Sequence, residues 1–131
     1  MFLSHTISVS IARPCDEVFA FLADPETYPR WAAVTGRFER LEEGLYRADT
    51  DSGPRLIAFR NDPRYGILDH AFYQEGEEPR FDPMRVVPNG AGTELIYTFI
   101  QREGMDEVLF ASTIEWIRTD LLTLKSLLES L

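Results

Sequence analysis

The chain has 131 residues, a length that fits one domain with its own hydrophobic core, and we expect residues 1–131 to form a single domain. Hydrophobic residues make up 44% of the chain and charged residues 27%, which excludes an intrinsically disordered protein. Acidic residues outnumber basic ones by 22 to 13, giving a formal net charge of -9. This charge repels phosphates, so we expect no nucleic-acid partner.

No apolar stretch approaches the roughly 20 residues of a membrane-spanning helix, and residues 1–10 lack the basic start of a signal peptide. The sequence therefore predicts a cytoplasmic protein with no membrane insertion. Cys15 is the single cysteine, and we expect it to be a structural thiol because acidic residues follow it. Neither metal-ligand spacing nor a phosphate-binding loop is present, so we expect no metal and no cofactor.

The first part of the chain predicts one strand followed by two short helices. Apolar and polar residues alternate over 5–11, the pattern of a strand with one buried face. A helix is expected at 14–23, where a proline and two acidic residues open the segment and apolar residues form a stripe. Asp24 and the proline after it suit the start of a second helical segment that runs to Trp31 and is bent by an internal proline.

Six further strands are predicted in the middle of the chain. Short β-favouring runs alternate there with turn sequences rich in glycine, proline, asparagine and aspartate, a pattern typical of an antiparallel meander. We place these strands at 36–42, 45–50, 55–60, 65–74, 81–87 and 93–101.

A helix of about 25 residues is predicted after Gly104, with Asp106 as its cap. Apolar residues follow one another along it at steps of four and three and form one seam: Phe110, Ile114, Ile117, Leu121, Leu124, Leu128 and Leu131. The flanks of the seam lack the systematic opposite charges of a coiled coil. We therefore expect the helix to pack on the sheet, with Trp116 off the seam.

This order of elements resembles the START-like superfamily, whose members have the helix-grip fold. The resemblance runs end to end and is sharpest in Ile7–Asp24, where a strand leads into a proline, an acidic helix start and aromatic residues, and then in Trp31. The segments Asn61–His70 and Pro83–Gly90 are similar to a bacterial cyclase-like branch. The superfamily includes polyketide cyclases and dehydrases, birch-pollen-allergen-like proteins and lipid-transfer domains.

The resemblance implies an α+β protein in which a curved, seven-stranded antiparallel sheet wraps around the long C-terminal helix. It also implies a cavity between the concave face of the sheet and that helix, where members bind or chemically reshape hydrophobic small molecules. Fold alone does not choose between these uses, so the residues that face the cavity carry the functional prediction.

Hairpin geometry predicts which residues share the concave face. In the expected pairing of the fourth and fifth strands of the meander, His70 faces Met84, while Asp69 and Arg85 form an ion pair on the opposite face. The next hairpin places Tyr97 opposite Met84 on the same apolar face.

His70 is the first candidate general acid or base, because the unperturbed pKa of histidine lies near neutral pH. Asp69 is unable to orient it, since successive strand residues point to opposite faces. The alternatives are a buried histidine that bonds a neighbouring hydroxyl, such as that of Tyr97, or a polar contact for a ligand.

Several other side chains are candidates for ligand contact. The length of the turn at 61–64 decides which residue lies opposite His70. One length places Arg55 there, where it would clamp a ligand carboxylate, and a change of one residue places Leu56 there instead. Trp31 would cap the cavity mouth or anchor its helix to the sheet. The full set of expected ligand-binding residues is Trp31, Arg55, Leu68, His70, Phe72, Met84, Tyr97 and Phe99.

The sequence supports three functions and leaves open whether the protein is an enzyme. The first is binding of a small hydrophobic or aromatic molecule in the cavity. The second is a cyclase, dehydratase or isomerase in which His70 moves a proton while Tyr97 or Arg55 stabilises an enolate oxygen. The third is a protein-interaction module that resembles helix-grip co-chaperone domains, with a homodimer formed through the surface around Trp116.

Overall fold

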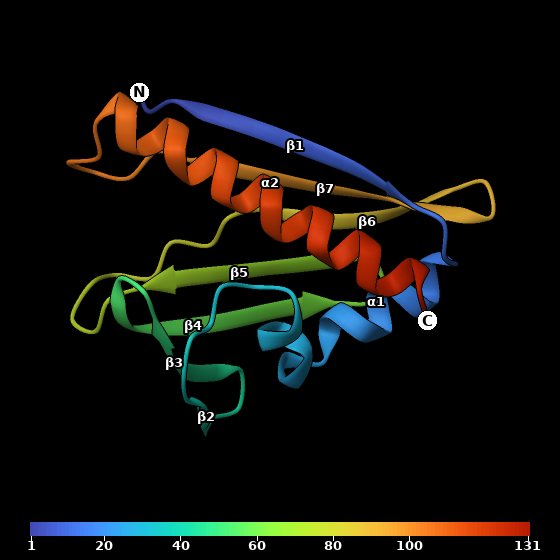
Figure 1. The fold of residues 1–131 in the computed structure, drawn as a ribbon, viewed down its shortest axis with the longest axis horizontal. Coiled ribbons are helices and arrows are strands. Elements are labelled where there is room, and N and C mark those ends of the chain that lie inside the picture. Colours follow the sequence, from blue (N-terminus) through green and yellow to red (C-terminus); the bar gives the residue numbers. More distant parts are fainter.

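The computed structural model describes residues 1–131 and contains one seven-stranded antiparallel sheet crossed by a long helix (Figure 1). The elements in chain order are β1 (Ser4–Ile11), α1 (Cys15–Ala23), η1 (Pro25–Arg30), β2 (Phe38–Glu42), β3 (Leu45–Thr50), β4 (Gly53–Asp62), β5 (Ile67–Tyr73), β6 (Met84–Asn89), β7 (Gly92–Ile100) and α2 (Glu107–Glu129). Across the sheet the strands lie in the order β1-β7-β6-β5-β4-β3-β2. None of the helices combines the length and the apolarity needed to cross a bilayer.

The predicted α+β class, element order and helix caps are confirmed. Asp24 caps η1, a 3-10 helix, by accepting a hydrogen bond from the Glu26 backbone N–H at 3.0 Å. Asp106 caps α2 by accepting from the Leu109 backbone N–H at 2.8 Å. The strand ends move by a few residues, and β6 begins only at Met84 because the proline before it has no N–H to donate to a neighbouring strand.

The hairpin between β4 and β5 places Phe59 opposite His70, where the sequence predicted Arg55 or Leu56. β4 continues to residue 62 and leaves a short turn that ends at Gly66. Gly66 has a φ of 65°, and a Cβ at this position would collide with a backbone carbonyl of β6, so glycine is required. Arg55 stays on the same face as His70, farther along β4.

The predicted register between β5 and β6 is wrong by two residues. His70 faces Asp82 rather than Met84. A slip of two residues leaves every side chain on its predicted face, because the side-chain period of a strand is two. The expected ion pair between Asp69 and Arg85 is absent, and the Asp69 carboxylate instead accepts a hydrogen bond from the Met84 backbone N–H at 3.0 Å. The register between β6 and β7 is the predicted one.

The apolar seam of α2 faces the sheet, as the sequence predicted. In Figure 1, α2 passes in front of the strands and ends beside α1. Ile114, Leu121, Leu124 and Leu128 are buried in the core. Leu131 lies beyond the end of the helix and is exposed. The seam therefore fixes α2 over the concave face and makes the helix one wall of the site described next.

Candidate functional site

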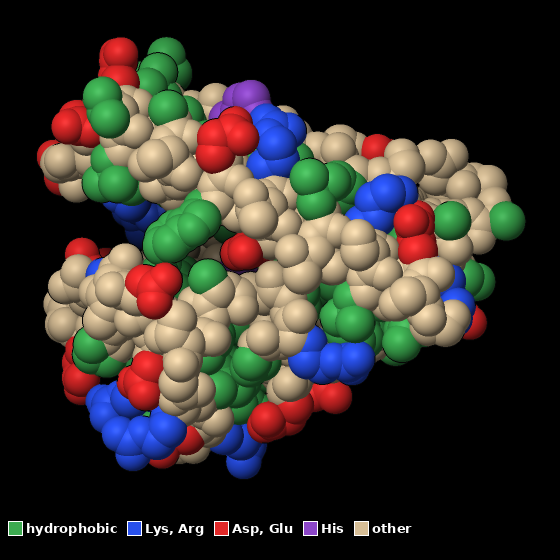
Figure 2. Space-filling model, in the orientation of Figure 1, with side chains coloured by type: hydrophobic (Ala, Val, Ile, Leu, Met, Phe, Trp, Pro, Cys, Tyr) green, Lys and Arg blue, Asp and Glu red, His purple; other side chains and the backbone are tan.

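A cavity of about 330 Å³ lies between α2, η1 and the concave face of the sheet. Hydrophobic residues account for 11 of the 19 that line it. Figure 2 shows this face hollowed between α2 and the strands below it, with hydrophobic side chains at the rim. The volume lies at the lower end of the range for small-molecule sites, so the space fits a compact organic molecule.

Most of the residues that the sequence placed at a ligand site lie at the wall of this cavity. They are Trp31, Arg55, His70, Phe72, Tyr97 and Phe99. Leu68 and Met84 share the concave face but do not line the cavity, and they are 2% and 3% exposed. Both belong to the packed core, because α1 covers β5 and β6 where these residues lie.

A buried ion pair forms one polar region of the wall. The Arg102 guanidinium donates hydrogen bonds to both carboxylate oxygens of Asp82, at 3.0 Å and 2.6 Å, and to the Ile100 carbonyl oxygen at 2.6 Å. The Tyr97 hydroxyl donates to Asp82 Oδ2 at 3.4 Å. Because the Asp82 side chain is only 5% exposed, this bidentate pairing is what compensates its charge.

His70 lies among aromatic rings next to that ion pair. Its ring centroid is 5.9 Å from Tyr28, 6.3 Å from Phe59 and 5.6 Å from Tyr97. Burial lowers the pKa of His70, and the negative charge of Asp82 opposes the shift. The imidazole is therefore neutral at pH 7, so one ring nitrogen carries a hydrogen and can donate, while the other can accept. The alternative in which His70 bonds the Tyr97 hydroxyl is not observed, and the hydrogen bond of that hydroxyl is with Asp82.

A second polar region combines η1 with α2. Tyr28 and Trp31 are three residues apart, one turn of a 3-10 helix, and their ring centroids are 5.1 Å apart. The Trp31 Nε1 atom is buried and has no hydrogen-bond partner. Asp120 lines the same cavity from α2, and burial raises the pKa of Asp120 to about 6, against the opposing effect of the Ala33 backbone. Burial, followed by the charge of Asp120, raises the pKa of Tyr28, so the phenol keeps its proton.

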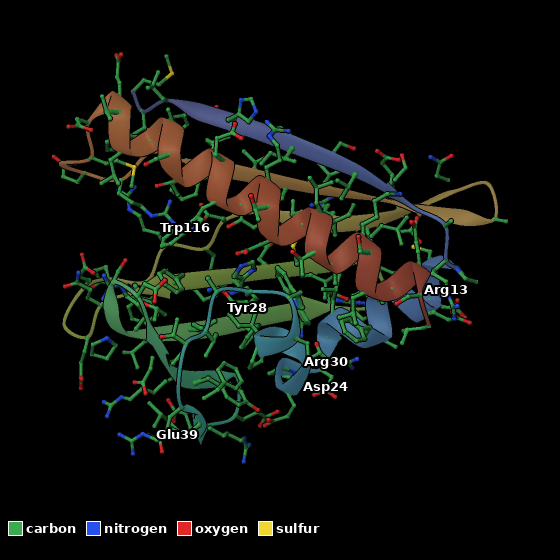
Figure 3. The ribbon with its side chains drawn as sticks, in the orientation of Figure 1. Arg13, Asp24, Tyr28, Arg30, Glu39 and Trp116 are labelled. Atoms are coloured by element: carbon green, nitrogen blue, oxygen red, sulfur yellow. The ribbon has the colours of Figure 1, made fainter.

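Trp116 lies at the rim of the cavity. Its side chain is 52% exposed, and it belongs to the cavity lining. Figure 3 shows Tyr28 below α2, over the strands, and Trp116 extending from α2 toward the same opening. A partner that covered the surface around Trp116 would therefore also cover the cavity mouth.

Comparison with known proteins gives structural matches only. No protein-family model matches the sequence, and no curated protein matches it. The aromatase/cyclase Zhui from Streptomyces sp. R1128 aligns over 98% of this chain and 94% of its own, with a TM-score of 0.77 and 21% identity. Ara h 8.0201 aligns over 100% of both chains, with a TM-score of 0.73 and 12% identity. The Aha1 dimer from Colwellia psychrerythraea aligns over 97% and 96%, with a TM-score of 0.74 and 12% identity.

The chain has the helix-grip fold. At these identities the likeness is one of fold, so the chemistry of this helix-grip cavity has to be argued from its own side chains.

Sequence reasoning missed four polar residues of the helix-grip cavity. Asp120 carried a signal, because it lies three residues after Ile117 on the flank of the seam, where a carboxylate is partly buried. Tyr28 carried a weaker one, as an aromatic residue inside a capped turn. Asp82 and Arg102 carried none for their pairing, since they lie beyond the ends of β6 and β7, where strand register no longer shows which side chains meet.

Proposed function

We propose that this protein binds a small hydrophobic or aromatic molecule in the cavity between the sheet and α2. The observation that carries the proposal is the cavity itself, a space of about 330 Å³ with a mostly hydrophobic wall. Phe72, Phe99 and Trp31 offer aromatic surface to a ligand. Burial of apolar surface contributes roughly 25 cal/mol per Å², and the polar groups of the wall fix the orientation of the bound molecule.

Filling the cavity should remove binding. Thr113 lines the cavity from α2, and a phenylalanine there would occupy ligand space. We expect Thr113→Phe to weaken binding of N-phenyl-1-naphthylamine, an uncharged apolar fluorescent probe, by at least about tenfold, equivalent to about 1.4 kcal/mol. A fluorescence titration measures the affinity.

Thr119→Phe is the matched control. Both threonine hydroxyls donate to the backbone carbonyl four residues earlier in α2, at 2.8 Å for Thr113 and 3.0 Å for Thr119. Thr119 is exposed and does not line the cavity, so the probe should bind this variant as it binds the wild type. Equal affinity of the two variants, or no saturable binding to the wild type, would refute the proposal.

Acid–base catalysis on a molecule in the same cavity is a second candidate function. It is favoured by the presence of two titratable groups in the lining of one cavity, His70 with a lowered pKa and Asp120 with a pKa of about 6. The shared fold with the aromatase/cyclase Zhui supports it as well. Of the two groups expected to stabilise an enolate oxygen, Tyr97 is engaged with Asp82, which leaves Arg55. Turnover of a bound molecule would separate this function from binding alone.

A further inference from the structure

We propose that the ligand carries an uncharged hydroxyl group on an aromatic ring, and that Tyr28 and Asp120 together bind this hydroxyl. The inference rests on the proposed function and adds the chemical class of the ligand. It depends on the hydrogen-bonding capacity that these two side chains leave unused.

Tyr28 brings an unpaired hydroxyl to the cavity. The residue is 8% exposed, lines the cavity, and has the rings of Trp31, Phe38, Phe59 and His70 within 6.0 Å of its own. Its hydroxyl forms no hydrogen bond within the protein. The hydroxyl is also not sealed off, since Trp31 Nε1 is the only fully buried side-chain polar atom without a partner. The Tyr28 hydroxyl is therefore free to bond a molecule in the cavity.

Trp31 forms the wall of the cavity beside Tyr28. The two rings meet edge to face at an interplanar angle of 69°, and both residues line the cavity. The Trp31 Nε1 atom is fully buried, so a molecule in the cavity contacts the ring of Trp31 and not its N–H.

Asp120 supplies the acceptor and discriminates against anions. Its carboxylate bonds no other side chain, and its charge acts on Tyr28. The backbone of Ala33 is its one hydrogen-bond partner, which leaves further acceptor positions for a ligand. A carboxylate on the ligand would be repelled at this position. A hydroxyl group meets both partners, because its oxygen accepts from Tyr28 while its hydrogen is donated to Asp120.

The other polar region of the wall does not compete for the same group. Arg102 directs its guanidinium to Asp82 and to the Ile100 carbonyl, so its charge is already paired. Arg55 is the remaining cation of the wall, and it donates to the Pro54 carbonyl at 2.9 Å. A ligand that relied on Arg55 would be an anion, and this alternative is included as one arm of the test.

The test compares four naphthalenes by their displacement of N-phenyl-1-naphthylamine at pH 7.5. 2-Naphthol has the hydroxyl, 2-methoxynaphthalene only an acceptor, 2-methylnaphthalene neither, and 2-naphthoate a negative charge. We expect 2-naphthol to bind about tenfold more tightly than 2-methylnaphthalene, as two net hydrogen bonds of ordinary strength imply. 2-Methoxynaphthalene should lie between them, and 2-naphthoate should bind most weakly.

Two variants locate the effect. Tyr28→Phe and Asp120→Asn should each reduce the preference for 2-naphthol over 2-methylnaphthalene to about twofold, while leaving the affinity for 2-methylnaphthalene unchanged. Tyr46→Phe is the control, because its hydroxyl bonds Glu26 at 3.3 Å and the residue does not line the cavity. The preference should survive in that variant.

The outcomes separate the inference from the proposed function. Equal displacement by all four naphthalenes would overturn the hydroxyl site and leave ligand binding standing. Tightest binding of 2-naphthoate would overturn it in favour of an anion at Arg55. If N-phenyl-1-naphthylamine itself does not bind, both the proposed function and this inference fail.

Discussion

Replacing Arg102 with methionine should lower the free energy of unfolding by about 3–5 kcal/mol. The substitution leaves the Asp82 carboxylate, whose side chain is 5% exposed, without the two hydrogen bonds that now compensate its charge. Methionine keeps the length of the apolar part of the side chain next to Phe99, so the expected loss reports the charge rather than a cavity. Urea unfolding at pH 7 measures the change.

Two further variants make this result specific. Arg64 also pairs with an aspartate, Asp62, at 3.0 Å, but its side chain is 75% exposed, so Arg64→Met should cost less than about 1 kcal/mol. Combining Arg102→Met with Asp82→Leu should recover most of the stability, because it removes both charges together. If Arg102→Met lowers the free energy of unfolding no more than Arg64→Met does, then Arg102 does not compensate a buried charge on Asp82.

Asp120→Asn should raise the free energy of unfolding above pH 6 by about 1–2 kcal/mol. This figure is smaller than the full pKa shift implies, because solvent in the cavity screens the carboxylate. The pKa of Asp120 is about 6 in the folded state, against 3.8 for an unperturbed aspartate, so between these two pH values the folded state holds more protons than the unfolded state. The contribution of Asp120 to stability therefore falls as pH rises from about 4 to 6. Asparagine removes this dependence, because it does not ionise.

Thermal or urea unfolding of both proteins from pH 4 to 8 measures the difference. Glu115→Gln is the control, since Glu115 lies on the same helix and its side chain is 72% exposed. That variant should follow the pH profile of the wild type within about 0.5 kcal/mol. A constant difference between Asp120→Asn and the wild type across this range would contradict a raised pKa at Asp120.

The elements of the fold were predictable because local patterns specify them. The alternation from His5 to Ile11, the cap at Asp106 and the spacing of the seam each depend on residues within a few positions of one another. The face of each strand residue was predictable as well, since an error of two residues in register leaves it unchanged.

The partners of the strand residues were harder to predict, because they depend on how long connections fold. The segment between β5 and β6 is irregular, and its length alone did not show that His70 faces Asp82. That two-residue difference removes the expected pair of Asp69 and Arg85. The observed pair of Asp82 and Arg102 lies beyond the ends of β6 and β7, where register gives no guide. The cavity also depends on where η1 and α2 lie over the sheet, which is a property of packing and not of any local pattern.

The most direct test of ligand binding in the cavity is a titration with N-phenyl-1-naphthylamine followed by two-dimensional 1H–15N NMR. The chain has two tryptophans, and both line the cavity, Trp31 in the wall and Trp116 at the rim. We predict saturable 1:1 shifts of both indole N–H signals and of backbone amides at the cavity wall, with the signals of the exposed residues Arg40–Glu42 of β2 unmoved. Shifts confined to the outer surface, or no saturable shift of either indole signal, would contradict binding in this cavity.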